Sequence, residues 1–242
     1  KANADGYTLM LDASSYSVNP SLYPKLPYDP NKEFKTLAVL ALYPNVLLVN
    51  PSFPAKSVKD LIAMAKAKPN SIAFASSGKG SAQHLAGALF EVQAGVEMQH
   101  IPYKGGLLAM QAVIAGDVDF MCENPQPTFM SPGSPIRPLA VFQPNRLALL
   151  PDVPSIQEAG FKQDLTIRSW HGLFLKRGTP ESITNRILKA TQDAMSRTAL
   201  RSRINAMAIE TVESNPQAFA SFFSSEVETW GKVIKDAQIK AD

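Results

Sequence analysis

The chain has 242 residues, of which 45% are hydrophobic and 19% are charged. In a chain of this length such a composition is typical of a globular protein with one or two domains, and it argues against long disordered tails. Its 24 Lys and Arg and 21 Asp and Glu leave a formal net charge of only +3. No basic run interleaved with aromatic residues accompanies this charge, so we expect no nucleic-acid partner. No apolar run approaches the ~20 residues that cross a bilayer, so we expect no direct membrane insertion.

Two features bear on the compartment. The chain starts at Lys1 without the apolar stretch of a signal peptide, so we interpret it as a mature or truncated sequence. The single cysteine, Cys122, has no partner for an intramolecular disulfide and fits either a reducing compartment or an exported protein.

Hydrophobic periodicity predicts strands and helices in alternation. The polar residues Ser14, Ser15 and Ser17 and then four prolines, starting at Pro20, indicate an extended surface passage after the first strand. The predicted strands lie at 7–11, at two places within 36–49, and at 72–75, 98–101, 118–122, 136–142 and 170–175, and the predicted helices begin after Ser57, Ser81, Gly106, Ser155, Thr179 and Asn215. This alternation implies an α/β fold with a largely parallel sheet.

Capping signals support several of these helix starts. Ser155 and Glu158 form a capping-box pattern before a short helix that Gly160 ends, and Thr179 is followed by Pro180 at the first helical position. The helix after Pro180 is expected to turn an apolar face inward, formed by Ile183, Ile187, Ala190 and Ala194.

The loop from Ser76 to Ser81 joins a predicted strand to a predicted helix, which is where α/β sheets bind ligands. Its glycines leave backbone N–H groups open, and the helix start adds partial positive charge, so a carboxylate or phosphate needs no arginine there. Ser76, Ser77 and Ser81 add hydroxyl groups. The alternative is an ordinary turn with Ser81 as helix cap. The turn at 103–106 repeats the same logic.

Two nucleotide-binding motifs are excluded at this loop. Gly80 separates Lys79 from Ser81, so the loop does not match Walker A. The dinucleotide fingerprint needs a third glycine where Gln83 stands. A nucleotide site is therefore disfavoured.

Metal and nucleophile sites find little support either. The chain shows no short metal-ligand spacing among His84, His100, His171 and Cys122, so we expect no metal. A Cys122/His nucleophile pair stays open, although Cys122 ends an apolar strand, where cysteine is more often a buried hydrophobe. Trp170 suits either a pocket wall or core packing.

Six segments are familiar as a set: 4–9 (Ala-Asp-Gly-Tyr-Thr-Leu), 49–62 (Val-Asn-Pro-Ser-Phe-Pro and onward), 75–87 (Ala-Ser-Ser-Gly-Lys-Gly-Ser and onward), 100–105 (His-Ile-Pro-Tyr-Lys-Gly), 150–155 (Leu-Pro-Asp-Val-Pro-Ser) and 170–174 (Trp-His-Gly-Leu-Phe). In this order and spacing they resemble the Bug-type substrate-binding proteins of tripartite tricarboxylate transporters. The resemblance runs through the whole chain.

The resemblance implies a non-catalytic periplasmic receptor with an α/β fold of the type II periplasmic-binding-protein kind, in which a hinge joins two lobes around a ligand cleft. The lobes would be residues 1–48 plus 172–242 and residues 49–171. It further implies a small organic carboxylate as ligand (a di- or tricarboxylate, an aromatic acid or an amino acid), no cofactor, and delivery to the permease subunits of the transporter. We expect an exported monomer whose signal peptide is not in this chain.

By matching position, the resemblance assigns ligand contacts along the chain. Ser14 and Ser15 stand in the polar loop after the first strand, Asn124 at a strand end, and Tyr103 and Trp170 in their respective motifs. The carboxylate-binding loop and helix start correspond to Ser76, Ser77, Gly78, Gly80, Ser81 and His84.

Two departures from the family pattern bear on the site. Family members begin with a further strand, a Pro-Gly-Gly loop and a helix, which are absent before Lys1. Leu107 and Leu108, after Gly106, replace the usual small polar residue and proline, which implies a more apolar side of the pocket.

Two alternatives from other functional classes stay open. An effector-binding regulatory domain can share the two-lobed architecture but would be attached to a DNA-binding helix-turn-helix. An enzyme that uses Cys122 and a histidine would lose its function in a Cys122→Ser variant, whereas a receptor would keep its affinity.

Overall fold

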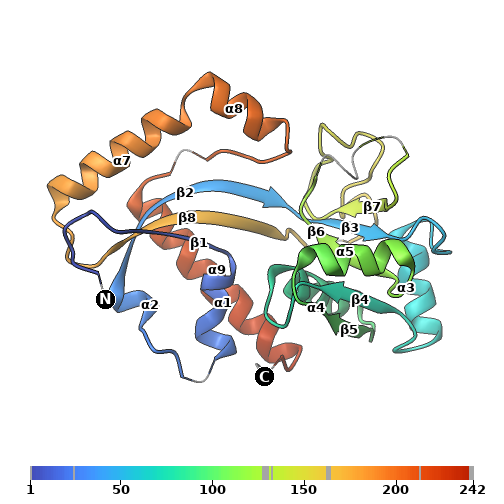
Figure 1. Cartoon of the computed structure of the whole chain (residues 1–242). Coiled ribbons are helices and arrows are strands. Elements are labelled where there is room, and N and C mark those ends of the chain that lie inside the picture. Colours follow the sequence, from blue (N-terminus) through green and yellow to red (C-terminus); the bar gives the residue numbers. More distant parts are fainter. Residues whose placement is uncertain are drawn as a thin grey trace. The chain divides into compact units, whose positions relative to one another are not determined.

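The computed structural model describes residues 2–23, 25–126, 131, 133–161, 165–212 and 214–239 (Figure 1). The chain divides into two compact units. The first consists of residues 1–43 and 169–232, and the second of residues 44–168 and 233–242. The lobes expected from the resemblance group residues 44–48, 169–171 and 233–242 differently.

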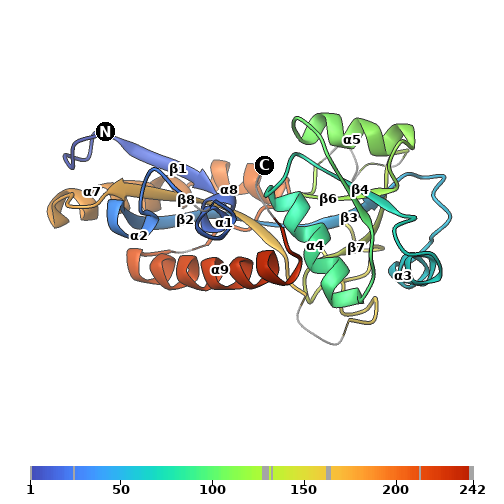
Figure 2. The ribbon, with the colours of Figure 1, turned by 90° about the horizontal axis from the view of Figure 1, so that it is seen from below.

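The first unit is built on a three-stranded sheet in the order β1-β8-β2. Its strands are β1 (Leu9–Ala13), β8 (Arg168–Lys176) and β2 (Phe34–Pro44), and β1 runs antiparallel to β8. The long helix α9 (Pro216–Asp236) lies along one face of this sheet (Figure 2). It starts where predicted, because the Asn215 side chain accepts a hydrogen bond from the Ala218 N–H and proline fits a first helical turn.

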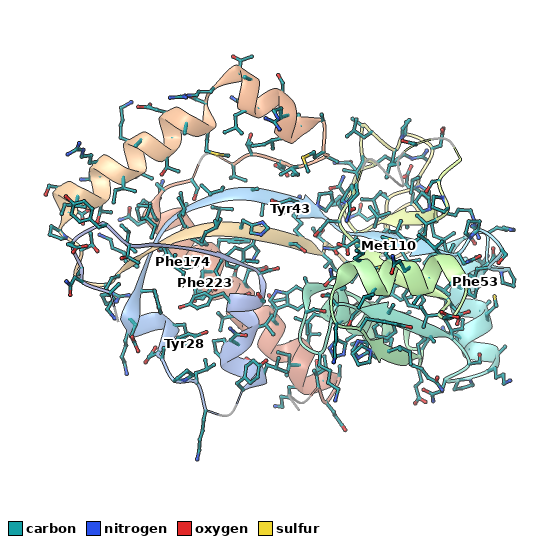
Figure 3. The ribbon with its side chains drawn as sticks, in the orientation of Figure 1. Tyr28, Tyr43, Phe53, Met110, Phe174 and Phe223 are labelled. Atoms are coloured by element: carbon teal, nitrogen blue, oxygen red, sulfur yellow. The ribbon has the colours of Figure 1, made fainter. Side chains whose placement is uncertain are left out.

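An aromatic core fills the space between this sheet and α9. Trp170 and Phe174 of β8 pack against Phe219 and Phe223 of α9, and the ring centroids of Phe174 and Phe219 are 4.9 Å apart. Figure 3 shows Phe174 and Phe223 side by side in this core. The last helix therefore turns an aromatic face toward the sheet at these positions.

The segment predicted as an extended passage after the first strand instead contains helix α1 (Ser15–Leu22). Its Tyr16, Val18 and Leu22 are buried, and we attribute the helix to this burial, which outweighs the cost of Pro20 inside it. A single turn of helix, α2 (Pro30–Glu33), follows before β2.

The helices α7 (Glu181–Met195) and α8 (Thr198–Asn205) complete the first unit. The inward face predicted for α7 is wrong in part, because Ala190 is exposed and Ile187 only half-buried, whereas Thr184 is buried. Pro180 occupies the N-cap position instead of Thr179, whose hydroxyl donates to the Lys176 C=O. The sequence pattern had not predicted α8.

The second unit is built on a five-stranded sheet in the order β5-β4-β6-β3-β7. Its strands are β3 (Val46–Val49), β4 (Ala73–Ser76), β5 (Gln99–Pro102), β6 (Phe120–Glu123) and β7 (Arg137–Val141). β4 is parallel to β5 and β6, and β3 is antiparallel to both β6 and β7. Only β3 therefore runs against the others in this sheet. The predicted largely parallel sheet is found in the second unit but not in the first.

The helices α3 (Val58–Ala67), α4 (Ala82–Ala94) and α5 (Gly106–Ala115) belong to the second unit. Side chains along a strand point alternately to opposite faces. On β4, Ala75 lies in a hydrophobic cluster with Ala109 and Val113 of α5, whereas Phe74 faces Gly87 of α4. The sheet therefore separates α4 from α5 (Figure 2).

Local capping in the second unit follows the sequence at most positions. The Ser57 side chain accepts a hydrogen bond from the Asp60 N–H at the start of α3, and the left-handed Gly116 ends α5. Ser155 and Glu158 form the reciprocal hydrogen bonds of a capping box. The residues after Ser155 nevertheless form turns and not the predicted helix.

Candidate functional site

Three parallel strands of the second unit end at the same edge of the sheet. In their register Ser76 of β4 lies beside Pro102 of β5, and Phe74 of β4 lies beside Phe120 of β6. Ligands of α/β proteins bind at the carboxyl ends of such strands. The structure brings to this edge most of the residues predicted for the site, namely Ser76, Ser77, Gly78, Gly80, Ser81, His84, Tyr103 and Asn124.

The loop from Ser76 to Ser81 uses several of its polar groups to hold its own shape. The Ser76 hydroxyl accepts a hydrogen bond from the Gly78 N–H at 3.2 Å. The Gly80 N–H donates to His84 Nδ1 at 3.0 Å, and the Ser81 hydroxyl accepts from the His84 N–H at 3.3 Å. The expectation of open N–H groups is therefore wrong at Gly78 and Gly80, whose donors are satisfied within the loop.

Two histidine rings form hydrogen bonds with this loop. The rings of His84 and His100 stack with centroids 3.7 Å apart, and His100 Nε2 lies 2.6 Å from the Ser76 hydroxyl. Burial, helped by the charge of Lys79, lowers the pKa of His84 to about 4. Burial and the neighbouring His84 lower the pKa of His100 to about 3. Both rings are therefore neutral at pH 7, as His84 Nδ1 must be to accept a hydrogen bond.

A chain of side chains connects the start of α4 to the end of β6. The Ser77 hydroxyl donates to Gln83 Oε1 at 2.7 Å, and Gln83 Nε2 donates to Glu123 Oε2 at 3.1 Å. The other carboxyl oxygen of Glu123 accepts from the Asn124 N–H, and Asn124 Nδ2 donates to the Pro44 C=O. Burial raises the pKa of Glu123. Sequence reasoning missed Gln83 in this role, since nothing in its neighbourhood signals a partner 40 residues away.

The start of α5 differs from the start of α4 because no side chain caps it. Its N-cap is Gly105, with φ +115°, and the first backbone bond of the helix runs from the Ala109 N–H to the Gly105 C=O. The N–H groups of Gly106, Leu107 and Leu108 therefore have no acceptor within the helix. The helix dipole gives this end partial positive charge. Such an end can hold a carboxylate or another small anion.

The two loops touch at the sheet edge. The Tyr103 N–H donates to the Ser76 C=O at 2.9 Å, and the Tyr103 side chain is half-buried against the hydrophobic cluster under α5. Glu123 Oε2 lies so close to Gly106 that a Cβ added there would be 3.2 Å from it. The open start of α5 thus lies beside the buried carboxyl group of Glu123, three residues after the Tyr103 that bonds to the Ser76 loop.

The remaining predicted site residues belong to the first unit. Ser14 precedes α1, its side chain makes no capping hydrogen bond, and its N–H donates to the Trp170 C=O at 3.1 Å. Ser15 is the first residue of α1. Trp170 is fully buried, and its indole N–H donates to Glu226 at 2.9 Å. Of the two roles considered for Trp170, the structure favours core packing.

Metal and nucleophile chemistry find no support among the described residues. No group of three or more His, Cys, Asp or Glu there could hold a metal ion. Cys122 is buried, and burial raises the pKa of its thiol, which disfavours the reactive thiolate. None of the described helices is long and apolar enough to cross a bilayer.

Comparison with known proteins places these features in a family context. The TctC family model, described as tripartite tricarboxylate transporter family receptor, matches residues 1–239. The structure is similar to that of the periplasmic binding protein BugD, with 28% identity and a TM-score of 0.87 over 100% of this chain and 82% of that one.

Two further similar structures carry ligands. Rpa4515 of R. palustris, solved with adipate, shares 31% identity and a TM-score of 0.86 over 99% of this chain and 81% of its own. MatC from Rhodopseudomonas palustris, with bound malate, shares 26% identity and a TM-score of 0.83 over 96% of this chain and 81% of its own.

Proposed function

Because the chain belongs to the family of tripartite tricarboxylate transporter receptors, we propose that it binds a small organic carboxylate in the periplasm and delivers it to the permease of such a transporter. The family consists of periplasmic solute-binding receptors and not of enzymes. The family predicted from the sequence motifs is thus confirmed, and an enzyme that uses Cys122 is set aside.

The observation that carries the proposal is the open start of α5. Three N–H groups, on Gly106, Leu107 and Leu108, lack an acceptor within the helix and lie at the positive end of its dipole. They suit the two oxygens of a carboxylate without a charged partner. Adipate and malate, the ligands of two similar receptors, are both carboxylates, which supports this choice of ligand class.

Other predicted residues take different parts in this proposal. Tyr103 supplies its hydroxyl group to the ligand, and Ser77 does so by exchanging its hydrogen bond to Gln83 Oε1 for one to the ligand carboxylate. Ser14 and Ser15 contribute from the start of α1. A ligand cleft between the two lobes expected from the resemblance, residues 1–48 plus 172–242 and residues 49–171, stays a prediction. It requires that Ser15→Ala and Ser77→Ala each weaken the affinity for the same acid.

A thermal-shift screen tests ligand binding. Succinate, malate, adipate, citrate, hexanoate, benzoate and glutamate are each added to the protein, and affinities of the hits are measured by calorimetry. An acid at about 100 times its Kd should stabilise the folded protein by about 2.7 kcal/mol. A cooperative transition that none of these classes of acid shifts would refute the proposal.

A charge variant then tests the position of the site. Leu107 is exposed, so Leu107→Asp adds a carboxylate at the start of α5, where it suits the helix dipole but repels a bound anion. Leu149→Asp makes the same change on an exposed leucine elsewhere in the second unit. We expect the Leu107→Asp variant to unfold at the same temperature as the wild type but to lose its affinity for the acid. The Leu149→Asp variant should keep that affinity.

Delivery to a permease needs a separate experiment. Cells that contain the transporter should take up the radiolabelled acid only when the receptor is present. The Leu107→Asp variant should fail to restore uptake, whereas Leu149→Asp should restore it. Uptake that does not depend on the receptor would refute the transport part of the proposal.

A further inference from the structure

The first turn of α5 presents two leucines to solvent. Leu107 is 74% exposed and Leu108 is 47% exposed, whereas Ala109, Ala112 and Val113 of the same helix are buried. The buried residues account for the packing of α5 on the sheet. The packing of the second unit therefore gives no reason for leucine at positions 107 and 108.

The geometry of a helix places these side chains beside the proposed carboxylate site. Cα–Cβ bonds in an α-helix tilt toward its N-terminus, so side chains of the first turn lean toward the open N–H groups. A carboxylate bound at the usual distance of about 2.9 Å from these groups brings its first carbon atoms against Leu107 or Leu108. Apolar atoms that meet there leave water, which favours binding.

The charge around this turn favours the same kind of ligand. The Glu123 carboxyl group is buried beside Gly106, so a ligand with one carboxylate brings less like charge to this turn than a ligand with two. Lys104 is exposed and hydrated, so it attracts anions at long range without selecting the body of the ligand.

We propose that Leu107 and Leu108 determine specificity, and that the ligand is a carboxylate with an apolar aliphatic or aromatic body. This inference rests on the proposed function and narrows its ligand class. A monocarboxylate is then preferred over a dicarboxylate of the same length, because the leucines gain contact with a methyl or ring carbon and gain none with a hydrated second carboxylate.

A matched pair of ligands and a matched pair of variants test this inference. Hexanoate and adipate have the same number of carbon atoms and differ in one terminal group. Calorimetry on the whole chain should give a Kd for hexanoate at least tenfold below that for adipate. Leu107→Ser should weaken hexanoate about tenfold, the equivalent of about 1.4 kcal/mol, and should weaken adipate by a clearly smaller factor, because adipate offers the leucine no terminal methyl group. Leu149→Ser, at another exposed leucine of the second unit, should change neither affinity.

The outcomes separate this inference from the function on which it rests. Wild-type protein that binds adipate as tightly as hexanoate, or a Leu107→Ser variant that weakens both acids equally or neither, would overturn the role of the leucines and leave a carboxylate receptor standing. Folded wild-type protein that binds no acid of either kind would overturn the proposed function itself.

Discussion

The stacked pair of His84 and His100 should make the stability of the second unit depend on pH. Burial lowers the pKa of His84 to about 4 and that of His100 to about 3, whereas histidine in an unfolded chain titrates near 6.5. Between these values the unfolded chain binds more protons than the folded one. The free energy of unfolding therefore falls as the pH falls from about 6.5 toward 4, and the stabilisation is fully present above 6.5.

The size of the effect follows from the difference between the pKa of histidine in the unfolded chain and in the folded protein. Each pH unit in this window costs about 1.4 kcal/mol for a histidine that stays neutral in the folded state, so His84 alone should cost about 2 kcal/mol between pH 6.5 and 5. The two rings touch, so the pair costs at most about twice that. Glu91 acts in the opposite sense, because burial raises its pKa to about 7.

A variant separates the histidine contribution from the carboxyl groups. Urea unfolding of the wild type and of His84→Gln is measured at about pH 7 and pH 5, and the difference between the two proteins is compared. We expect the free energy of unfolding of the wild type, relative to that of His84→Gln, to be about 2 kcal/mol lower at pH 5 than at pH 7. A difference that stays constant between the two pH values would refute the argument that burial keeps His84 neutral.

Three further predictions concern the stability of the same unit. Gly87→Ala should destabilise by about 1–3 kcal/mol in thermal unfolding, although alanine favours helix, because the added Cβ would lie 2.3 Å from the Phe74 ring; a raised Tm would contradict this. Ser81→Ala should cost about 1 kcal/mol in urea unfolding through loss of the α4 cap, and no change would mean that the cap is unimportant. Glu123→Gln should gain stability over the wild type as the pH is raised from about 5 to 8, because the buried carboxyl group must then ionise; urea midpoints that run in parallel over this range would argue against the raised pKa.

Much of the secondary structure could be predicted because its causes are local. Ser57 and Ser81 each cap a helix through an N–H three residues away, and Gly116 ends α5 by adopting the left-handed conformation. The prediction failed where distant packing decided the outcome. The segment that contains Pro20 became a helix, and we attribute this to the burial of Tyr16, a contribution that no local pattern reveals.

The candidate site divides in the same way. The alternation of strands and helices was enough to predict that the loops at 76–81 and 103–106 precede helices, at places where α/β sheets bind ligands. It could not predict the stacking of His84 on His100 or the hydrogen bond from Gln83 to Glu123. Those contacts join residues far apart in the chain, so only the packed sheet brings them within reach.

The sequence by itself determined the family, the starts of α3, α4 and α9, and the positions of the glycines in the two loops. The tertiary structure decided which polar groups of those loops are satisfied and which are open. The Gly80 N–H donates a hydrogen bond to the His84 ring, whereas the start of α5 has three N–H groups without an acceptor in the helix. A hydrogen bond needs its two atoms within about 3 Å, and that distance is set by how the whole sheet and its helices pack.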